Sequence, residues 1–269
     1  MKDLNNKIIA LISDFGPKGQ HYVASMKGVI LKINPKVKII DISHNISSFS
    51  IIEASYLIKS TYKYFPKNSV FLIVVDPGVG SAREIIAIET ESHYYFVGPN
   101  NGIFHNSLES DNINKCVKIE NDEYFHKPVS STFHGRDIMA PISAYITKGI
   151  SLEKLGTRLD LKDLVKYPME YKERGDNKIS CSIQYIDNFG NIITNIKGEM
   201  LSLVEGKILI IKRKKGENQG KFVRYFEGVP KNSLLFLIGS SGFLEISINQ
   251  GNASKYLDLK VGDIIEIII

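Results

Sequence analysis

The stretch that decides the fold is SVFLIVVDPGVGSAR, residues 69–83. Its continuous apolar run at residues 71–75 predicts a strand that is covered on both faces. Asp76 follows where the strand ends, and a Pro-Gly pair with a further glycine forces a turn. Ligands of open α/β sheets bind just beyond the carboxyl ends of the strands, so Asp76 and Arg83 are candidate site residues. The alternative is that Asp76 caps its own turn and that Arg83 is solvated.

The segments around this strand alternate between strand and helix. Ser50 and Glu53 form a capping-box pair that opens a helix just before the central strand. This βαβ rhythm predicts a parallel sheet with right-handed crossovers. The other expected elements are strands at residues 8–12, 37–42, 85–89 and 94–97, a helix over residues 26–33 and a helix over residues 138–148.

The pattern of expected helices and strands changes at residues 166–178, KYPMEYKERGDNK. These residues are polar and include Pro and Gly. We take this segment as a domain boundary, with an α/β sheet domain over residues 1–168 and an all-β barrel domain over residues 178–269. No convincing helix is expected in the second domain. Its expected strands cover residues 179–186, 192–196, 207–211, 222–226, 234–238, 244–248 and 264–269.

Composition indicates a soluble globular protein. The 269 residues are 43% hydrophobic and 23% charged, and no apolar run reaches the ~18 residues of a membrane span. The start, MKDLNNKIIALISDFG, lacks the layout of a signal peptide. The two cysteines, Cys116 and Cys181, argue against a disulfide framework, so we expect a cytoplasmic protein. The basic run at residues 212–215 looks like a solvated hairpin tip rather than a nucleic-acid site.

Several polar residues are expected at strand ends or in adjoining loops of the first domain. They are Asp14, Asp76, Asn101 and His134. Convergence of such groups is more informative than any one of them, because a loop histidine alone is more often structural than catalytic. His44, Asp76 and Asp137 lack the spacing of a metal site, so no metal is expected. In the second domain, the polar turns at residues 187–191 and 239–245 are hairpin loops by default.

Taken together, these segments resemble the S-adenosyl-L-methionine hydroxide adenosyltransferase family, adenosine-forming hydrolases related to the bacterial fluorinase and chlorinase. The resemblance covers nearly the whole chain, and its motifs occur in order. They are SDFG at 13–16, DISH at 41–44, VDPGVGS at 75–81, GPNNG at 98–102, FHGRD at 133–137, YIDNFGN at 185–191, GSSGFLEI at 239–246 and NQGNA at 249–253.

The resemblance implies an N-terminal α/β domain, a C-terminal β-barrel and a homotrimer. Each active site would lie between the N-terminal domain of one subunit and the C-terminal domain of its neighbour. The implied reaction is hydrolysis of S-adenosyl-L-methionine to adenosine and methionine by in-line attack of an activated water on the ribose 5′ carbon. No metal or redox cofactor is implied, and the composition already argues against a nucleic-acid or membrane partner.

The resemblance also implies roles for individual residues. Asp76, Arg83 and His134 match the set that holds the nucleophilic water, and Asp14 would accept hydrogen bonds from the ribose hydroxyls. Asn101 would lie near the ribose, and Asn191 with the backbone at Ile248 would read the adenine edge. The other implied substrate contacts are Phe49 or Phe243 as the stacking residue, Asp187 as partner of the methionine ammonium, and Ser240 and Glu245 as pocket lining.

Two alternatives remain beside the hydrolase. The first is a halogenase. The halogenases of this group carry Tyr where this chain has Asp76 and Thr where it has Val79, and a carboxylate beside the nucleophile would repel a halide. The fluorinase also carries Arg where this chain has Ser241. The second alternative is an adenosine-binding module that senses without turnover. Such a module would have no need of Asp76, Arg83 and His134 together, so we favour the hydrolase.

Overall fold

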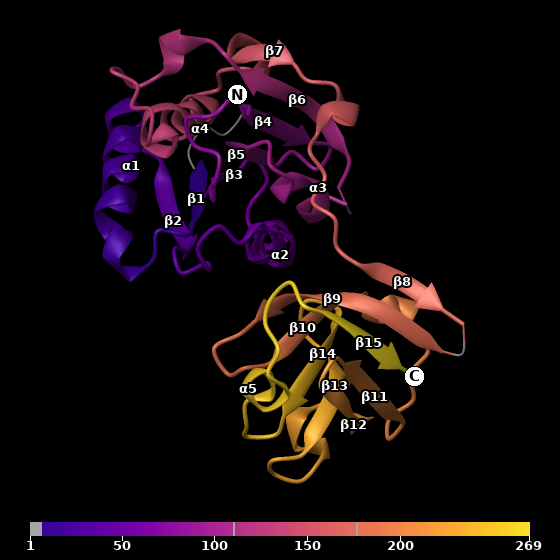
Figure 1. Cartoon of the computed structure of the whole chain (residues 1–269). Coiled ribbons are helices and arrows are strands. Elements are labelled where there is room, and N and C mark those ends of the chain that lie inside the picture. The colour runs from indigo at the N-terminus through magenta and orange to yellow at the C-terminus, as the bar shows by residue number, and fades with distance from the viewer. Residues whose placement is uncertain (1–6, 110, 176) are drawn as a thin grey trace. The chain divides into compact units, whose positions relative to one another are not determined.

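The computed structural model describes residues 7–109, 111–175 and 177–269. The chain divides into two compact units, Met1–Tyr167 and Pro168–Ile269, which are described separately below (Figure 1). The N-terminal segment that we expect not to be a signal peptide includes residues 1–6, which lie outside the described residues. In the described ranges, no helix has both the length and the apolar character that a bilayer span requires.

The first unit is built on one seven-stranded sheet in the order β2-β1-β3-β5-β4-β6-β7. The neighbours β2, β1, β3 and β5 run parallel, as the βαβ rhythm predicts, whereas β4, β6 and β7 are antiparallel to their neighbours. The strands are β1 (Ile8–Ser13), β2 (Lys38–Ser43), β3 (Val70–Val74), β4 (Ile85–Thr90), β5 (Tyr95–Pro99), β6 (Ile113–Ile119) and β7 (Gly156–Arg158).

Helices cover both faces of this sheet, which explains the continuous apolar runs of its central strands. On β3, Leu72 belongs to the core that includes Met26 of α1 (Gln20–Ile33) and Ile142 of α4 (Ala140–Thr147). Its neighbour Phe71 belongs to the opposite core, which receives α2 (Ile51–Thr61) and α3 (Ile103–Ser107). The unit is therefore a three-layer α/β/α sandwich.

The helix expected at residues 138–148 begins earlier than the sequence indicates. A π-helical turn over Gly135–Met139 precedes α4 and continues directly into it. Such turns are rare in proteins as a whole, and those that do occur are often found at functional sites. This one follows His134 directly.

The order of the strands creates a switch point between β1 and β3. From β1 the chain passes through α1 to β2 on one side, and from β2 it passes through α2 to β3 on the other side of β1. Ligand sites in such sheets lie beyond the carboxyl ends of the two strands where the order reverses. Those ends are Ser13 and Val74.

The second unit is a closed seven-stranded β-barrel. Its strands follow the order β10-β14-β13-β12-β11-β15-β9, a further pairing of β9 with β10 closes the ring, and β8 adds to β9 outside it. The strands are β8 (Tyr171–Arg174), β9 (Lys178–Ile186), β10 (Ile192–Lys197), β11 (Ile208–Arg213), β12 (Gly216–Phe222), β13 (Leu234–Ile238), β14 (Phe243–Ile248) and β15 (Ile264–Ile268).

Two expectations for this unit were wrong, the position of one strand and the absence of a helix. The strand expected at residues 222–226 lies at Gly216–Phe222, because the polar segment pairs with β11 across a turn at Lys214 and Lys215. The segment taken as the domain boundary contains the division between the two units, after Tyr167, and it also carries β8. A short helix, α5 (Ala253–Leu257), is present, and the Asn252 side chain caps it by accepting the Lys255 N–H at 2.7 Å.

Candidate active site

Two carboxylates follow the neighbouring strands at the switch point. Asp14 comes directly after β1, and Asp76 comes two residues after β3. Together with His134 they line a cavity of about 320 Å³. The remaining lining residues are Phe15, Ser48, Phe49, Val74, Val79, Thr132, Phe133 and Gly135. The position of this cavity is the one that the topology favours for a ligand.

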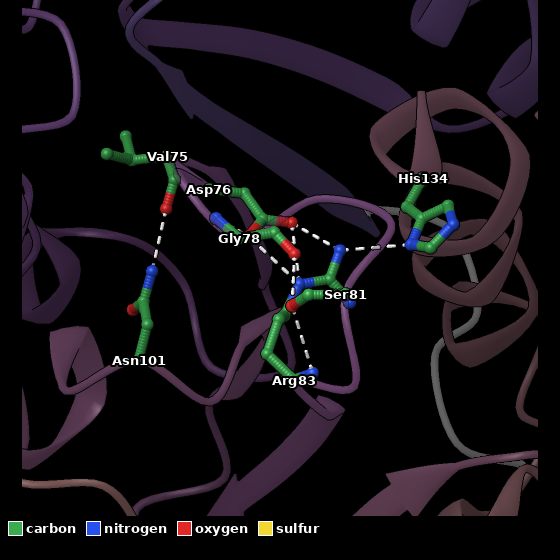
Figure 2. Close-up of polar contacts among 7 residues, drawn as sticks. All are labelled: Val75, Asp76, Gly78, Ser81, Arg83, Asn101 and His134. Atoms are coloured by element: carbon green, nitrogen blue, oxygen red, sulfur yellow. Dashed lines mark hydrogen bonds and ion pairs between the residues drawn. The ribbon is translucent and has the colours of Figure 1, made fainter. Parts of the chain in front are cut away.

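Asp76, Arg83 and His134 form one hydrogen-bonded unit (Figure 2). Arg83 Nε donates to Asp76 Oδ1 at 2.9 Å and to Oδ2 at 2.8 Å, and its Nη2 also contacts Oδ2. The same Nη2 lies 3.0 Å from His134 Nδ1. The side chains of Asp76 and Arg83 are only 6% and 12% exposed, so Arg83 is not the solvated residue of the alternative interpretation.

The contact with Arg83 determines the tautomer of His134. A guanidinium can only donate, so Nδ1 accepts and the ring proton lies on Nε2. Burial and the Arg83 charge lower the pKa of His134 below its ordinary value, against the opposing charges of Asp76 and Asp137. His134 is therefore a neutral imidazole at neutral pH, and its Nε2–H is its free hydrogen-bonding group.

We expect nitrogen NMR of the folded protein to find His134 as the Nε2–H tautomer with a pKa below 6.5, the unperturbed value. Arg83→Met should raise the pKa of His134, because a positive charge that opposes protonation is removed. Asp76→Asn should lower it, because a favourable negative charge is removed. A wild-type pKa above 6.5, or shifts of the opposite sign in the two variants, would contradict this electrostatic account.

The turn after β3 places Arg83 back on Asp76. Gly78 N–H donates to Asp76 Oδ1 at 3.2 Å, so Asp76 also caps its own turn, as the alternative interpretation expected. Ser81 Oγ donates to the Gly78 carbonyl at 2.7 Å and accepts the Arg83 N–H at 3.2 Å (Figure 2). Gly80 has φ +79°, and a Cβ there would lie 2.4 Å from the Ser131 carbonyl oxygen. The turn is thus packed closely against the segment that precedes His134.

We expect Gly80→Ala to reduce any activity of this site by roughly tenfold or more, because the added Cβ pushes the turn away from Ser131 and separates Arg83 from His134. Gly149→Ala is the matched control. Gly149 has φ +90° but no atom within 4 Å of a Cβ, so it shares the backbone strain of about 1–3 kcal/mol without the clash. Steady-state rates of the two variants test this, and equal losses would show that the close approach at Gly80 is unimportant.

His134 is held by the segment on either side of it. The Asp137 side chain is fully buried, and it accepts the Ser130 N–H at 2.8 Å and two hydrogen bonds from Arg136, at 2.6 and 2.9 Å. The Arg136 guanidinium also lies over the Phe133 ring, 5.0 Å from its centroid. A Cβ on Gly135 would lie 2.8 Å from Val74 Cγ1, so this residue allows the chain to pass close to β3.

Asp14 and Phe49 meet at the cavity. Asp14 Oδ2 accepts the Phe49 N–H at 2.8 Å, and Phe49 has φ +68°, a region that non-glycine residues rarely adopt. The Phe49 side chain is 66% exposed. A large apolar side chain that is exposed beside a cavity is suited to cover a ligand.

Asn101 lies beside the end of β3, but it does not line the cavity. Its amide nitrogen donates to the Val75 carbonyl at 2.9 Å (Figure 2), and its Oδ1 accepts the Ile103 N–H at 3.4 Å. In this structure Asn101 joins β3 to the start of α3.

The second unit has its own large cavity, of about 850 Å³, and Asn191 and Ile248 line it. Sequence reasoning missed its exposed aromatic residues Tyr225 and Phe226, which were assigned to a strand end. The signal that could have found them is a pair of adjacent aromatic residues next to a glycine turn. The other lining residues are Phe189, Glu227, Asn249, Gln250, Gly251 and Asn252.

Asp187 shapes the edge of this cavity. Its Oδ1 accepts the N–H groups of Phe189 and Asn191, each at 2.9 Å, and its Oδ2 accepts the Asn191 side-chain amide at 2.8 Å. Glu245 is near enough for the Asp187 charge to act on it. Burial raises the pKa of Glu245, the Asp187 charge adds to this, and a 3.1 Å hydrogen bond from Ser247 opposes it.

Ser240, Phe243 and Glu245 do not line the 850 Å³ cavity. Ser240 lies in the exposed turn between β13 and β14, whereas Phe243 is buried on β14. The structure thus places the predicted residues in two groups, one in each unit. Among the described residues, no group of three His, Cys, Asp or Glu side chains could hold a metal ion.

Comparison with known proteins matches both units to one family. The family model described as SAM hydroxide adenosyltransferase N-terminal domain matches residues 9–156, and that of the C-terminal domain matches residues 181–266. A protein of Methanocaldococcus jannaschii named (R)-S-adenosyl-L-methionine hydrolase is 44% identical over 278 residues, which is 100% of this chain and 98% of the relative.

Two further matches extend the comparison. A crystal structure of an uncharacterized conserved protein from Thermotoga maritima aligns with TM-score 0.90 and 37% identity, covering 97% of this chain and 100% of that one. A fluorinase of an Actinoplanes species is 27% identical over 216 residues, 71% of this chain and 72% of the relative. These matches confirm the resemblance that the sequence motifs indicated, and the chain belongs to the S-adenosyl-L-methionine hydroxide adenosyltransferase family.

Proposed function

We propose that this protein hydrolyses S-adenosyl-L-methionine to adenosine and L-methionine. The observation that carries the proposal is the hydrogen-bonded Asp76–Arg83–His134 unit, of which Asp76 and His134 line a cavity at the switch point of the sheet. A binding module would not need this unit. The relative that shares 44% identity is named for the same reaction.

The main requirement of this reaction is that the protein orients a water molecule for attack. The water oxygen forms a bond to the ribose 5′ carbon while the bond from that carbon to sulfur breaks. Sulfur leaves as a neutral thioether with the bonding electrons, so no general acid is required, and one proton of the water is released. No step of this displacement calls for a metal ion, and we expect a chelator to leave the rate unchanged.

The geometry suggests a division of roles in the unit. Asp76 accepts a hydrogen bond from the attacking water and aligns it. Arg83 is a poor base, so it stabilises the hydroxide character that develops on the water. His134 has no free acceptor nitrogen while Nδ1 faces Arg83, so its role is to fix Arg83 and to offer its Nε2–H.

The other residues fit the parts of the substrate. Asp14 accepts from the ribose hydroxyls, Phe49 covers the ligand, and Asn101 supports the site from the end of β3. Asn191 and the backbone at Ile248 bind adenine in the cavity of the second unit. Asp187, Ser240, Phe243 and Glu245 bind the methionine portion of the substrate.

We propose a homotrimer, in which the sites join the first unit of one subunit to the second unit of its neighbour. We also propose a cytoplasmic location, where Cys116 and Cys181 stay reduced.

A mixing experiment tests the assembly. Asp76→Asn disables the first unit and Asn191→Ala disables the second, so each variant alone should be inactive. Co-expressed subunits with distinct tags should recover part of the activity, because some sites then combine two intact units. Light scattering should give the mass of three chains. No recovery with a trimeric mass would place each site within one subunit.

The function is tested by incubating the protein with S-adenosyl-L-methionine in oxygen-18 water containing chloride. We expect adenosine that carries heavy oxygen at the 5′ position, lost in His134→Ala and Asp76→Asn. Chlorinated nucleoside would instead identify a halogenase. Tight binding of adenosine with no turnover would identify an adenosine-binding module, and either result would overturn the proposal.

A further inference from the structure

The loops that follow β1 and β2 are joined to each other by contacts on either side of Asp14. Gly16 N–H donates to the His44 carbonyl at 2.7 Å, and Phe49 N–H donates to Asp14 Oδ2 at 2.8 Å. A third link uses side chains, because Ser13 Oγ lies 2.7 Å from His44 Nδ1. The backbone next to Asp14 is therefore tied to the second loop on both sides.

The third link continues into a chain of side chains. His44 Nε2 lies 3.1 Å from Asp41 Oδ1, and Lys27 Nζ donates to Asp41 Oδ2 at 2.5 Å. Burial alone would raise the pKa of Asp41, but the contacts with Lys27 and His44 hold it below its ordinary value. Asp41 is thus a carboxylate at neutral pH, and it places a negative charge beside His44 Nε2.

The charge of Asp41 bears on the direction of the Ser13–His44 hydrogen bond. The 3.1 Å contact of Nε2 with Asp41 Oδ1 is an ion-pair distance and does not have the geometry of a hydrogen bond. The negative charge of Asp41 still favours the neutral His44 tautomer that carries its proton on Nε2. Nδ1 is then an acceptor, and the Ser13 hydroxyl donates to it. Ser13 is fully buried and His44 is 8% exposed, so water cannot readily replace this bond.

We infer that His44 is a positioning residue for ligand binding, which holds Ser13 and thereby the Asp14 carboxylate and Phe49 in place. The inference rests on the proposed function only in taking Asp14 as a ribose contact. His44 itself is outside the lining of the cavity and is separate from the Asp76–Arg83–His134 unit. Its loss should therefore weaken ligand binding more than it slows the chemical step.

The test uses two amide substitutions of His44, each of which retains the contact of only one of the two ring nitrogens. Asn places an amide oxygen near the position of Nδ1, and Gln places an amide NH₂ group near the position of Nε2. His44→Asn can keep the bond to Ser13, whereas His44→Gln keeps only the contact with Asp41. Ser13→Ala removes the same bond from the other side and leaves His44 in place. Lys27→Met is the control, because its ion pair with Asp41 is partly exposed and contributes little.

We expect His44→Gln and Ser13→Ala to raise the adenosine dissociation constant and the KM by roughly tenfold with little change in kcat. His44→Asn and Lys27→Met should remain within about threefold of wild type. The double variant Ser13→Ala with His44→Gln should bind no more weakly than either single variant, because both remove one interaction.

Calorimetric binding of adenosine provides a readout that does not depend on turnover. Wild type that binds adenosine but does not hydrolyse S-adenosyl-L-methionine would overturn the proposed function and leave this inference intact. Unchanged binding in Ser13→Ala, or equal losses in His44→Asn and His44→Gln with all variants folded by circular dichroism, would overturn the inference. So would a fall in kcat at constant KM.

Discussion

Asp76→Asn is expected to lower kcat for S-adenosyl-L-methionine hydrolysis by ~10³-fold while adenosine binding stays within a few-fold of wild type. The amide has the size of the carboxylate, but it replaces one acceptor oxygen by a donor group and removes the negative charge beside Arg83. The water then loses the group that aligns it in the transition state. Single-turnover rates and adenosine calorimetry on the same preparation separate the two effects.

Asp122→Asn is the matched control for this substitution. Asp122 also pairs with a basic residue, since Lys127 Nζ lies 2.7 Å from its Oδ2, but the two side chains are 66% and 58% exposed. Its loss should leave both rate and binding unchanged. A rate for Asp76→Asn within tenfold of wild type would remove Asp76 from the chemistry, and an equal loss of adenosine affinity would make it a binding residue.

The site residues of the first unit that follow β1 and β3 could be predicted from the sequence, because the pattern that reveals them lies in short continuous segments. Apolar runs indicated where β1 and β3 end, and carboxylates within two residues of those ends had to lie at the same edge of the sheet. Three-dimensional contact was still needed to learn that Arg83 faces both Asp76 and His134. That contact depends on the turn at Gly80, whose close approach to Ser131 leaves no trace in a hydrophobic pattern.

The second unit shows where the sequence signal is too weak. The segment GENQGKF, residues 216–222, has no apolar alternation, and it becomes β12 because it pairs with β11 and β13. The strand was therefore expected one segment too late. The same error concealed Tyr225 and Phe226, which line the larger cavity instead of continuing a strand. Pairing partners, rather than intrinsic propensity, determine such strands.

Arg83→Met is expected to destabilise the first unit by about 3–5 kcal/mol as well as to abolish activity. The Asp76 side chain is 6% exposed, so removal of its partner leaves a buried carboxylate without a compensating charge. Met retains much of the apolar stem of Arg, so the loss reports the charge rather than a cavity. Native-state hydrogen exchange of peptides from β1 and β3 measures this free energy within the unit itself.

The double variant Asp76→Asn with Arg83→Met decides whether the unpaired charge is the cause. With the carboxylate neutralised, the double variant should be more stable than Arg83→Met alone, although it remains inactive. Lys127→Met, which breaks the exposed pair with Asp122, should change protection by no more than about 0.5 kcal/mol. If Arg83→Met lies within 1 kcal/mol of wild type by this measure, water reaches Asp76 readily. The low-dielectric setting from which Arg83 and His134 derive their roles would then be absent.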